Sequence, residues 1–499
     1  MVALGRDLRG LGHRLTFVHC DHALRAGCTT MNALGVADNE NEKKKEEVCA
    51  HCVQAARAAE KLGAWETRWL VGQQSLSSRK IRKIDRDLLK KAAAYEPLLQ
   101  FKAEKIETEP ELEKICANRH QGLVNLWTQA KQLLLENKYD GIICYNSLYG
   151  LHRMFSLIAK RRGIPFLSLH HSHNAGIDDE FTLVRDDIFR FLRQLQKHFK
   201  KIRPDQRNLN HVNSMHDQAI FSSKKIWSYS SARENKPAFL PSQKYAKKVL
   251  VSLSSPDEVF AAQFINVVPE SSRRHAFSNQ IQWLRWVKLL AVRYPDVLFW
   301  IRPHPRLYPN KREKRISQLA RLLEIERTTP APENIFWPAP EEQGSVWHHL
   351  ERTDILFNAW STLADDFGKQ GIPVITFFPD FSNSGRVVDY FSSSVEGYEK
   401  LFSRVIRNPS ARSRKTLHQK WRFLFLKANT FSLSLKRSML FRLISKVFPK
   451  KDKIIWNTRA LFLKNSKTTV KNEKLNTLLL KLLSKKKGFS GKIRDTVVF

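Results

Sequence analysis

The sequence predicts an α/β fold with two parallel-sheet domains that face a cleft. Short apolar strands alternate with helices in both halves of the chain, which is the pattern of parallel βαβ units. In the first half, strands are expected at 139–146 and 164–171, with a helix at 151–162 that Gly163 ends. In the second half, strands are expected at 248–253, 297–301, 355–358 and 373–378, with helices at 278–294 and 362–370.

Three segments are expected along the chain: an N-terminal domain at 1–245, a second domain at 246–410 and a basic, partly helical extension at 411–499. In the first segment, a helix at 5–12 precedes a strand at 13–18. A Rossmann-like unit has a strand and a glycine-containing loop before such a helix. Either the start codon is misassigned or this copy has lost its first strand.

The charge of the chain is unevenly distributed. The net charge is +37, and residues 411–499 carry +21 of it, with 24 Lys and Arg against three acidic residues. Such a balance favours polyanionic neighbours, namely nucleic acid, anionic lipid or phosphorylated substrates. No apolar run reaches the ~18 residues that span a bilayer, and no secretory signal is visible. With few cysteines, this pattern indicates a cytoplasmic protein.

A basic turn follows the strand predicted at 297–301. It reads Arg302-Pro303-His304-Pro305-Arg306. In open α/β sheets the ligand crevice lies at the carboxyl ends of the strands. A guanidinium and an imidazole there, stiffened by two prolines, suit a phosphate or pyrophosphate. The alternative is a proline-rich turn with incidental charges.

A second polar segment follows the strand predicted at 355–358. Ser361 or Thr362 is expected to cap the next helix, and free N–H groups at a helix start bind anions. Asp366, one turn later, could face the same cleft and accept hydrogen bonds from ribose hydroxyls. Taken alone, this segment is better explained by ordinary capping, with acidic residues favoured in the first turn.

Together these segments resemble the capsule polysaccharide biosynthesis glycosyltransferases, a family that includes users of CMP-activated Kdo or sialic acid. In that family R-P-H-P is followed by N-[IV]-x-x-x-x-P, by an S-T-x-x-x-E helix start and by G-x-P-V. Here the later segments read Asn334-Ile335 with Pro340, and Gly371-Ile372-Pro373-Val374. Asp366 stands where the family usually has Glu. The resemblance covers about 130 residues well, and the first half matches only in pattern.

The resemblance implies the GT-B fold, with two Rossmann-like domains, and an inverting sugar transfer that requires no cofactor. The implied partners are a nucleotide-sugar donor, preferably a CMP-sugar, and a growing capsular or cell-surface glycan or lipid-linked glycan as the acceptor. Arg302, His304 and the helix start at Ser361 and Thr362 would hold the nucleotide phosphate. The full implied donor site is Arg302, His304, Pro305, Ser361, Thr362 and Asp366.

An inverting transfer also needs a base that deprotonates the acceptor hydroxyl. Two carboxylates, Asp257 and Glu258, follow the strand predicted at 248–253. Two imidazoles, His170 and His171, end the strand predicted at 164–171. All four are candidates, although solvated loop histidines explain the second pair as well.

Four cysteines near the start of the chain have the spacing C-x7-C-x20-C-x2-C. They are Cys20, Cys28, Cys49 and Cys52. A C-x-x-C pair with a second pair can hold a structural zinc ion. Simple burial of the thiols is the alternative.

The extension mixes apolar and basic residues at 423–447 and has lysine clusters at 450–453 and 485–487. This composition suits a helix on an anionic membrane surface, which would place the protein on the inner face of the cytoplasmic membrane. A helix that returns to the first domain and a solvated extension are the alternatives.

Three other functions stay open at this stage, one of which is that of a catalytically inactive relative that serves as an assembly partner. A glycerol-phosphate-type transferase of surface polymers uses similar R-P-H-P signatures. A non-catalytic protein that binds polyanions or nucleic acid would explain the charge. We expect no nucleic-acid partner, because no nucleic-acid-binding module is recognisable and the charge is concentrated in the extension.

Overall fold

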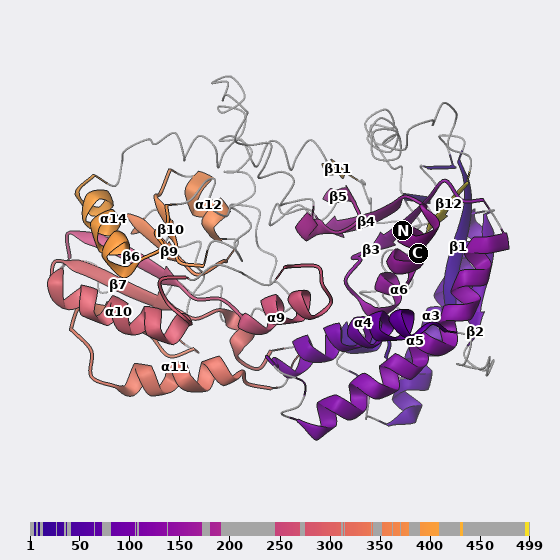
Figure 1. Cartoon of the computed structure of the whole chain (residues 1–499), viewed down its shortest axis with the longest axis horizontal. Coiled ribbons are helices and arrows are strands. Elements are labelled where there is room, and N and C mark those ends of the chain that lie inside the picture. The colour runs from indigo at the N-terminus through magenta and orange to yellow at the C-terminus, as the bar shows by residue number, and fades with distance from the viewer. Residues whose placement is uncertain are drawn as a thin grey trace, which may run out of the picture.

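The computed structural model describes most of residues 13–190 and 245–408, together with 4–5, 8–9, 430–432 and 495–498. The longest gaps within the two main ranges are 72–80, 172–179, 343–351 and 379–389. Two β-sheets lie on opposite sides of the molecule, and helices α4 and α9 lie between them (Figure 1). The predicted α/β class with parallel sheets is confirmed.

The second sheet is entirely parallel, with the strand order β10-β9-β6-β7-β8. This is the order of a doubly wound sheet, with the first strand in the centre. Its strands are β6 (Lys247–Ser252), β7 (Val297–Arg302), β8 (Ile335–Phe336), β9 (Ile355–Asn358) and β10 (Val374–Thr376). Its helices are α9 (Pro256–Phe264), α10 (Gln280–Arg293), η3 (Pro305–Leu307), α11 (Gln318–Thr328), α12 (Leu363–Lys369) and α14 (Val395–Arg407).

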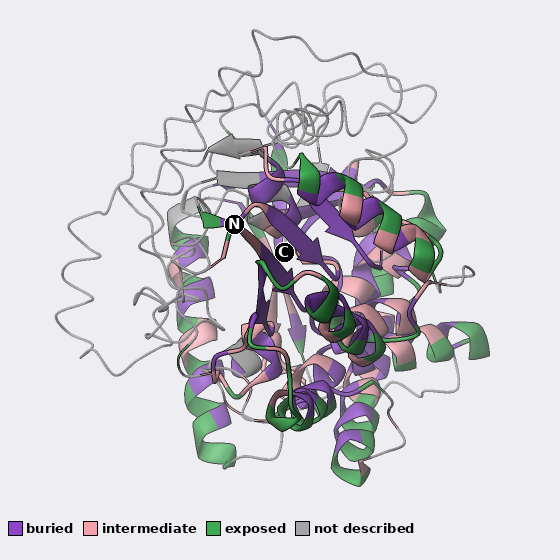
Figure 2. Cartoon of the chain, turned by 90° about the vertical axis from the view of Figure 1, so that its left-hand side faces the viewer, coloured by how far each residue is buried: buried purple, intermediate pink, exposed green. Residues whose placement is uncertain are grey.

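Both faces of this sheet are covered, because alternate residues of each strand enter different cores. Phe299 and Phe357 pack with Trp283 of α10 on one face. Their neighbours Trp300 and Leu356 pack with α12 on the other face. All six residues of β7 are buried, as expected for the apolar run at 297–301, and the buried sixth residue is Arg302. The strands of the sheet are mostly buried, although both residues of β8 are only half-buried, whereas the helices have exposed outer faces (Figure 2).

The first sheet has seven strands in the order β11-β5-β4-β3-β12-β1-β2. Strand β5 pairs antiparallel with both β4 and β11, and the other pairs are parallel. The strands are β1 (Arg14–Asp21), β2 (Glu66–Val71), β3 (Gly141–Tyr145), β4 (Phe166–His171), β5 (Glu180–Arg185), β11 (Thr430–Ser432) and β12 (Asp495–Val498). The helices are α2 (Thr29–Ala33), α3 (Glu42–Gly63), α4 (Lys83–Phe101), α5 (Pro110–Glu136) and α6 (Gly150–Arg162).

The centre of the first sheet is occupied by a strand from the end of the chain. Strand β12 lies between β1 and β3, parallel to both, with Val498 opposite Phe17 and Ile143. In a doubly wound sheet this position belongs to the first strand, the one that the sequence analysis could not find. The 411–499 segment therefore contributes β11 and β12 to this sheet. The described part of that segment is confined to these two strands.

An apolar contact joins the two sheets through their helices. Tyr95, Leu98 and Phe101 of α4 pack in one cluster with Ala261 and Ala262 of α9. This contact lies beside the carboxyl ends of β6 and β7. It therefore places the end of α4 next to the loops that follow those strands.

The predicted elements agree with the structure to within a few residues. The helix that Gly163 ends is α6, and Gly163 has φ 66°, which glycine adopts readily. Between β2 and β3 the chain forms two long helices, α4 and α5. Within the described residues, no helix is long and apolar enough to cross a membrane. Residues 203–243 and most of the extension lie outside the described residues.

Strand β12 is expected to contribute to the stability of the first sheet. Deletion of 494–499 removes the backbone hydrogen bonds that β12 makes on both sides, each of which contributes about 1 kcal/mol. We expect a loss of several kcal/mol in the free energy of unfolding, measured by urea denaturation. Deletion of residue 499 alone is the control, because it lies beyond the strand. Equal stability of the two deletion variants would contradict the role of β12.

Candidate functional site

The predicted donor residues lie at one edge of the second sheet. Ser252, the last residue of β6, is opposite both Arg302 of β7 and Asn358 of β9. The loops that follow these three strands therefore meet at the carboxyl edge. Asp257 and Glu258 enter from the first turn of α9, and His304 enters from the turn before η3.

Arg306 is the centre of this site. Its side chain is almost fully buried, at 4% exposure. Nη1 forms an ion pair with Asp257 and donates to Ser255 Oγ at 3.2 Å. Nη2 donates to the Leu99 carbonyl of α4 at 2.7 Å and to Glu313 at 3.1 Å. Burial opposes its charge, but the neighbouring carboxylates raise the pKa of Arg306 above its ordinary value.

Asp257 is held in this buried ion pair. It is 1% exposed, and Ser255 Oγ donates to its Oδ1 at 2.5 Å, while Arg306 binds its Oδ2. A carboxylate with both oxygens occupied in this way is poorly placed to accept a proton from a substrate. The geometry therefore favours Glu258 over Asp257 as the base.

Glu258 has the properties of an acid–base group. Its side chain is half-exposed, and Oε1 lies 3.7 Å from Arg306 Nε. Desolvation, with the charges of Asp257 and Glu313 added, raises the pKa of Glu258 to about 7, although Arg306 acts in the opposite direction. A carboxyl that titrates near neutral pH is suited to proton transfer.

His304 is a neutral imidazole among positive charges. Burial first, and then Arg306, Arg302 and Lys102, lower the pKa of His304 to about 3. Its Nδ1 accepts the Arg306 backbone N–H at 3.2 Å, so that the ring proton is on Nε2. The three cations that suppress protonation of His304 would attract an anion such as a phosphate.

Lys102 adds a cation to the site from the end of α4, which belongs to the first half of the chain. It caps α4 in the left-handed conformation, with φ 52°, and its Nζ donates to the Tyr308 carbonyl at 2.6 Å. Burial lowers the pKa of Lys102 to about 8. Sequence analysis missed Lys102, because nothing in its local sequence points to a contact 206 positions away. Arg306, by contrast, belongs to the basic turn and could have been included.

The helix-start residues are only partly described. Ser361 donates its N–H to Asn358 Oδ1 at 3.0 Å, and Ser361 Oγ accepts the Leu363 N–H at 3.3 Å. Ser361 is therefore a cap at the same sheet edge as Arg302. Thr362 lies outside the described residues, and Asp366 is in α12 with its side chain not described. Pro305 begins η3.

The two candidate histidines belong to the first sheet. His170 and His171 end β4, and Ser168 Oγ lies 2.7 Å from His170 Nε2. The side chain of His171 is not described. These two histidines therefore lie on a different sheet from Arg302 and the other predicted donor residues.

The four cysteines near the start are free thiols placed around β1 and α3. Within the described ranges, no group of three or more His, Cys, Asp or Glu side chains already has the geometry of a metal site. The zinc ion stays a prediction.

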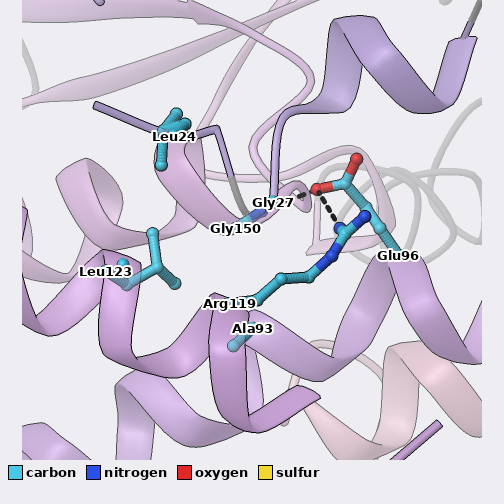
Figure 3. A pocket seen from close by; sticks show the side chains of 8 residues that line it. Leu24, Gly27, Ala93, Glu96, Arg119, Leu123 and Gly150 are labelled. Atoms are coloured by element: carbon cyan, nitrogen blue, oxygen red, sulfur yellow. Dashed lines mark hydrogen bonds and ion pairs between the residues drawn. The ribbon is translucent and has the colours of Figure 1, made fainter. Parts of the chain in front are cut away.

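A small pocket lies in the first half, away from the predicted donor residues (Figure 3). Its lining includes the buried side chains of Glu96 and Arg119, and Arg119 Nη1 lies 3.6 Å from Glu96 Oε2. The Gly150 N–H donates to the same oxygen at 3.4 Å. This group links α4, α5 and α6, which explains it as part of the packing of the first half.

No protein-family model matches the chain, and no curated protein matches it. A solved KpsC β-Kdo 2,4-transferase from Thermosulfurimonas dismutans is 12% identical, over 56% of this chain and 77% of its own, with a TM-score of 0.33. The UDP-GlcNAc 2-epimerase of Methanocaldococcus jannaschii, solved with UDP-GlcNAc and UDP, is 11% identical, over 83% of this chain and 99% of its own, with a TM-score of 0.27. Similarities of this size do not establish a shared fold or activity.

The buried ion pair predicts different consequences for two adjacent carboxylates. Asp257→Ala leaves the Arg306 charge buried without its main partner, which costs about 3–5 kcal/mol. Glu258→Gln keeps the size of a half-exposed side chain and is expected to change stability little. Urea denaturation of both variants measures the difference. Equal losses would mean that Asp257 does not anchor Arg306.

Proposed function

We propose that the chain is a glycosyltransferase that moves a sugar from a nucleotide-activated donor to a capsular or cell-surface glycan, free or lipid-linked. The observation that carries this proposal is the pairing, at one carboxyl sheet edge, of a cationic group with a half-exposed carboxyl group that lies 3.7 Å from Arg306. Arg302 and Lys102, with the neutral imidazole of His304 beside them, form the first, and Glu258 is the second. The resemblance of the surrounding motifs to capsule glycosyltransferases supports the same assignment.

In this proposal the donor phosphate binds beside Arg302 and His304. A guanidinium is always charged and binds phosphate oxygens in a bidentate manner. His304 donates from Nε2 as a neutral imidazole, because its Nδ1 accepts a backbone N–H. Ser361, the cap of α12, lies at the same sheet edge, and in this proposal Ser361 and Thr362 add donors. These groups stabilise the charge that develops on the leaving phosphate.

The transfer step follows from these placements. The acceptor hydroxyl oxygen attacks the anomeric carbon, and the bond from that carbon to the phosphate oxygen breaks. Glu258 takes the hydroxyl proton, and the phosphate leaves with the electron pair of the broken bond. One displacement of this kind inverts the anomeric configuration. The chain's own side chains supply each role, and the proposed reaction is therefore metal-independent.

We assign a CMP-sugar as the preferred donor, by resemblance to the transferases of Kdo and sialic acid. A lipid-linked acceptor would agree with a cytoplasmic protein held on the membrane's inner face by its basic 411–499 segment, which carries 24 Lys and Arg. Nucleic acid is not a proposed partner.

Nucleotide binding is expected to depend on His304. At 100 times its dissociation constant, a bound nucleotide adds about 2.7 kcal/mol to stability. We expect a thermal shift with CMP or CDP that exceeds the shift with UDP or GDP and is lost in His304→Ala. His170→Ala is the matched control, because that imidazole lies on the first sheet.

A shift that survives in His304→Ala would contradict the donor-site assignment. Absence of any nucleotide shift, with tight binding to polyanions that salt weakens steeply, would favour the alternative of a polyanion-binding protein.

The rate of transfer is expected to follow the ionisation of Glu258. Because the base must be deprotonated, kcat/KM rises with pH through about 7, the pKa of this carboxyl in the free protein. Glu258→Gln is expected to lower kcat/KM by roughly 100- to 10,000-fold and to remove this pH limb. If kcat/KM of Glu258→Gln still rises with pH through about 7, Glu258 is not the base. His170 would then be the next candidate.

A further inference from the structure

We propose that the first half contains a structural Zn²⁺ site, separate from sugar transfer, whose ligands are the thiolates of Cys20, Cys28, Cys49 and Cys52. The ion would tie the loop after β1 to helix α3. Nothing in the proposed transfer reaction uses these thiols.

The fold brings the four cysteines to one place. Cys20 is near the carboxyl end of β1, and Cys28 precedes α2 after a short turn. Cys49 and Cys52 lie three residues apart in α3, so they share one face of that helix. Helix α3 contacts both β1 and α2, so the four cysteines lie on or beside elements that touch one another.

Packing confirms this proximity. Cys28, Cys49 and Cys52 belong to one small cluster with Met31 and Val48. Cys20 and Cys28 pack together against the core of the first sheet. A charge on Cys28 would act on each of the other three thiols. The structure therefore holds four soft sulfur donors within electrostatic range of one another.

Backbone N–H groups lie beside two of these sulfurs. The N–H groups of Ala23 and Leu24 bond to the sulfur of Cys20. Those of Thr30 and Met31 bond to the sulfur of Cys28. Such N–H donors stabilise the charged form of a sulfur ligand, and outer groups of this kind orient the ligands of metal sites.

The donor set fits zinc better than the alternatives. Four thiolates are a common set for structural Zn²⁺. Binding of Zn²⁺ requires each thiol to lose its proton. A dication displaces such protons. The sulfurs are not yet in coordination geometry, so binding requires side-chain rotations that draw them together.

Two of the nearby histidines, His22 and His51, have polar partners elsewhere, which favours sulfur ligands over these two imidazoles. His22 Nδ1 lies 2.8 Å from Asp21, and His22 Nε2 lies 3.1 Å from Glu46. His51 Nδ1 lies 2.6 Å from the Glu47 carbonyl oxygen.

The test is the metal content of the full chain, purified under reducing conditions and dialysed against buffer without chelator. Elemental analysis is expected to find about one zinc per chain, as for a Cys₄ site. Cys52→Ala is expected to lose at least roughly 10-fold in zinc content. Cys144→Ala is the matched control, because Cys144 is a buried thiol of β3 in the same half, outside the cluster. That variant should keep its zinc.

Two further measurements keep the proposal testable if Cys52→Ala folds poorly. Cys52→His supplies another zinc ligand and is expected to restore the metal. Co²⁺ exchanged into the original chain should show thiolate-to-metal absorption that Cys52→Ala lacks. Absence of zinc from the original chain, equal zinc in Cys52→Ala, or a Cys49–Cys52 disulfide found by mass spectrometry would overturn the proposal. Each result is independent of nucleotide binding, which is measured at the other sheet.

Discussion

The buried ion pair between Arg306 and Asp257 is the interaction on which the candidate site depends. Removing two charges from water is costly, and a buried pair is retained where its hydrogen bonds are satisfied and it fixes a geometry. Here one guanidinium joins three elements, since it also binds the Leu99 carbonyl of α4 and the carboxylate of Glu313. Its backbone N–H in turn sets the tautomer of His304. The donor turn, the start of α9 and the end of α4 are thus held as one unit.

Apolar packing supports this polar link. The cluster shared by α4 and α9 excludes water beside the ion pair, and Lys102 at the end of α4 bonds to the Tyr308 carbonyl. Arg153 of α6 donates to the Ile265 carbonyl at 3.1 Å, which adds a further polar contact between the halves. Because these contacts join elements of different sheets, the cationic character of the site depends on both halves of the chain.

The sequence predicted four of the five strands of the second sheet, because each is an apolar run such as 297–301 that is followed by a polar turn, but it missed the two-residue strand β8. The sequence could not show which of Asp257 and Glu258 is better placed as the base, because the burial of each residue depends on the packing of the helix. It also missed Lys102 and Leu99, whose bonds to the donor turn span more than 200 positions. Strand β12 shows the same limit, because its partners in β1 lie at the opposite end of the chain.

In the proposed reaction, the charges of the site make the pKa of the base depend on whether the donor is bound. Arg306 lowers the pKa of Glu258, whereas Asp257 and Glu313 raise it, so this pKa reports the local balance of charge. A phosphate bound beside Arg302 and His304 adds negative charge and shifts that balance upward for both Glu258 and His304. The carboxylate becomes a stronger base, but a smaller fraction of it is ionised at a given pH. The pH at which the donor-bound protein reaches half its maximal rate should therefore lie above the pKa of Glu258 in the free protein.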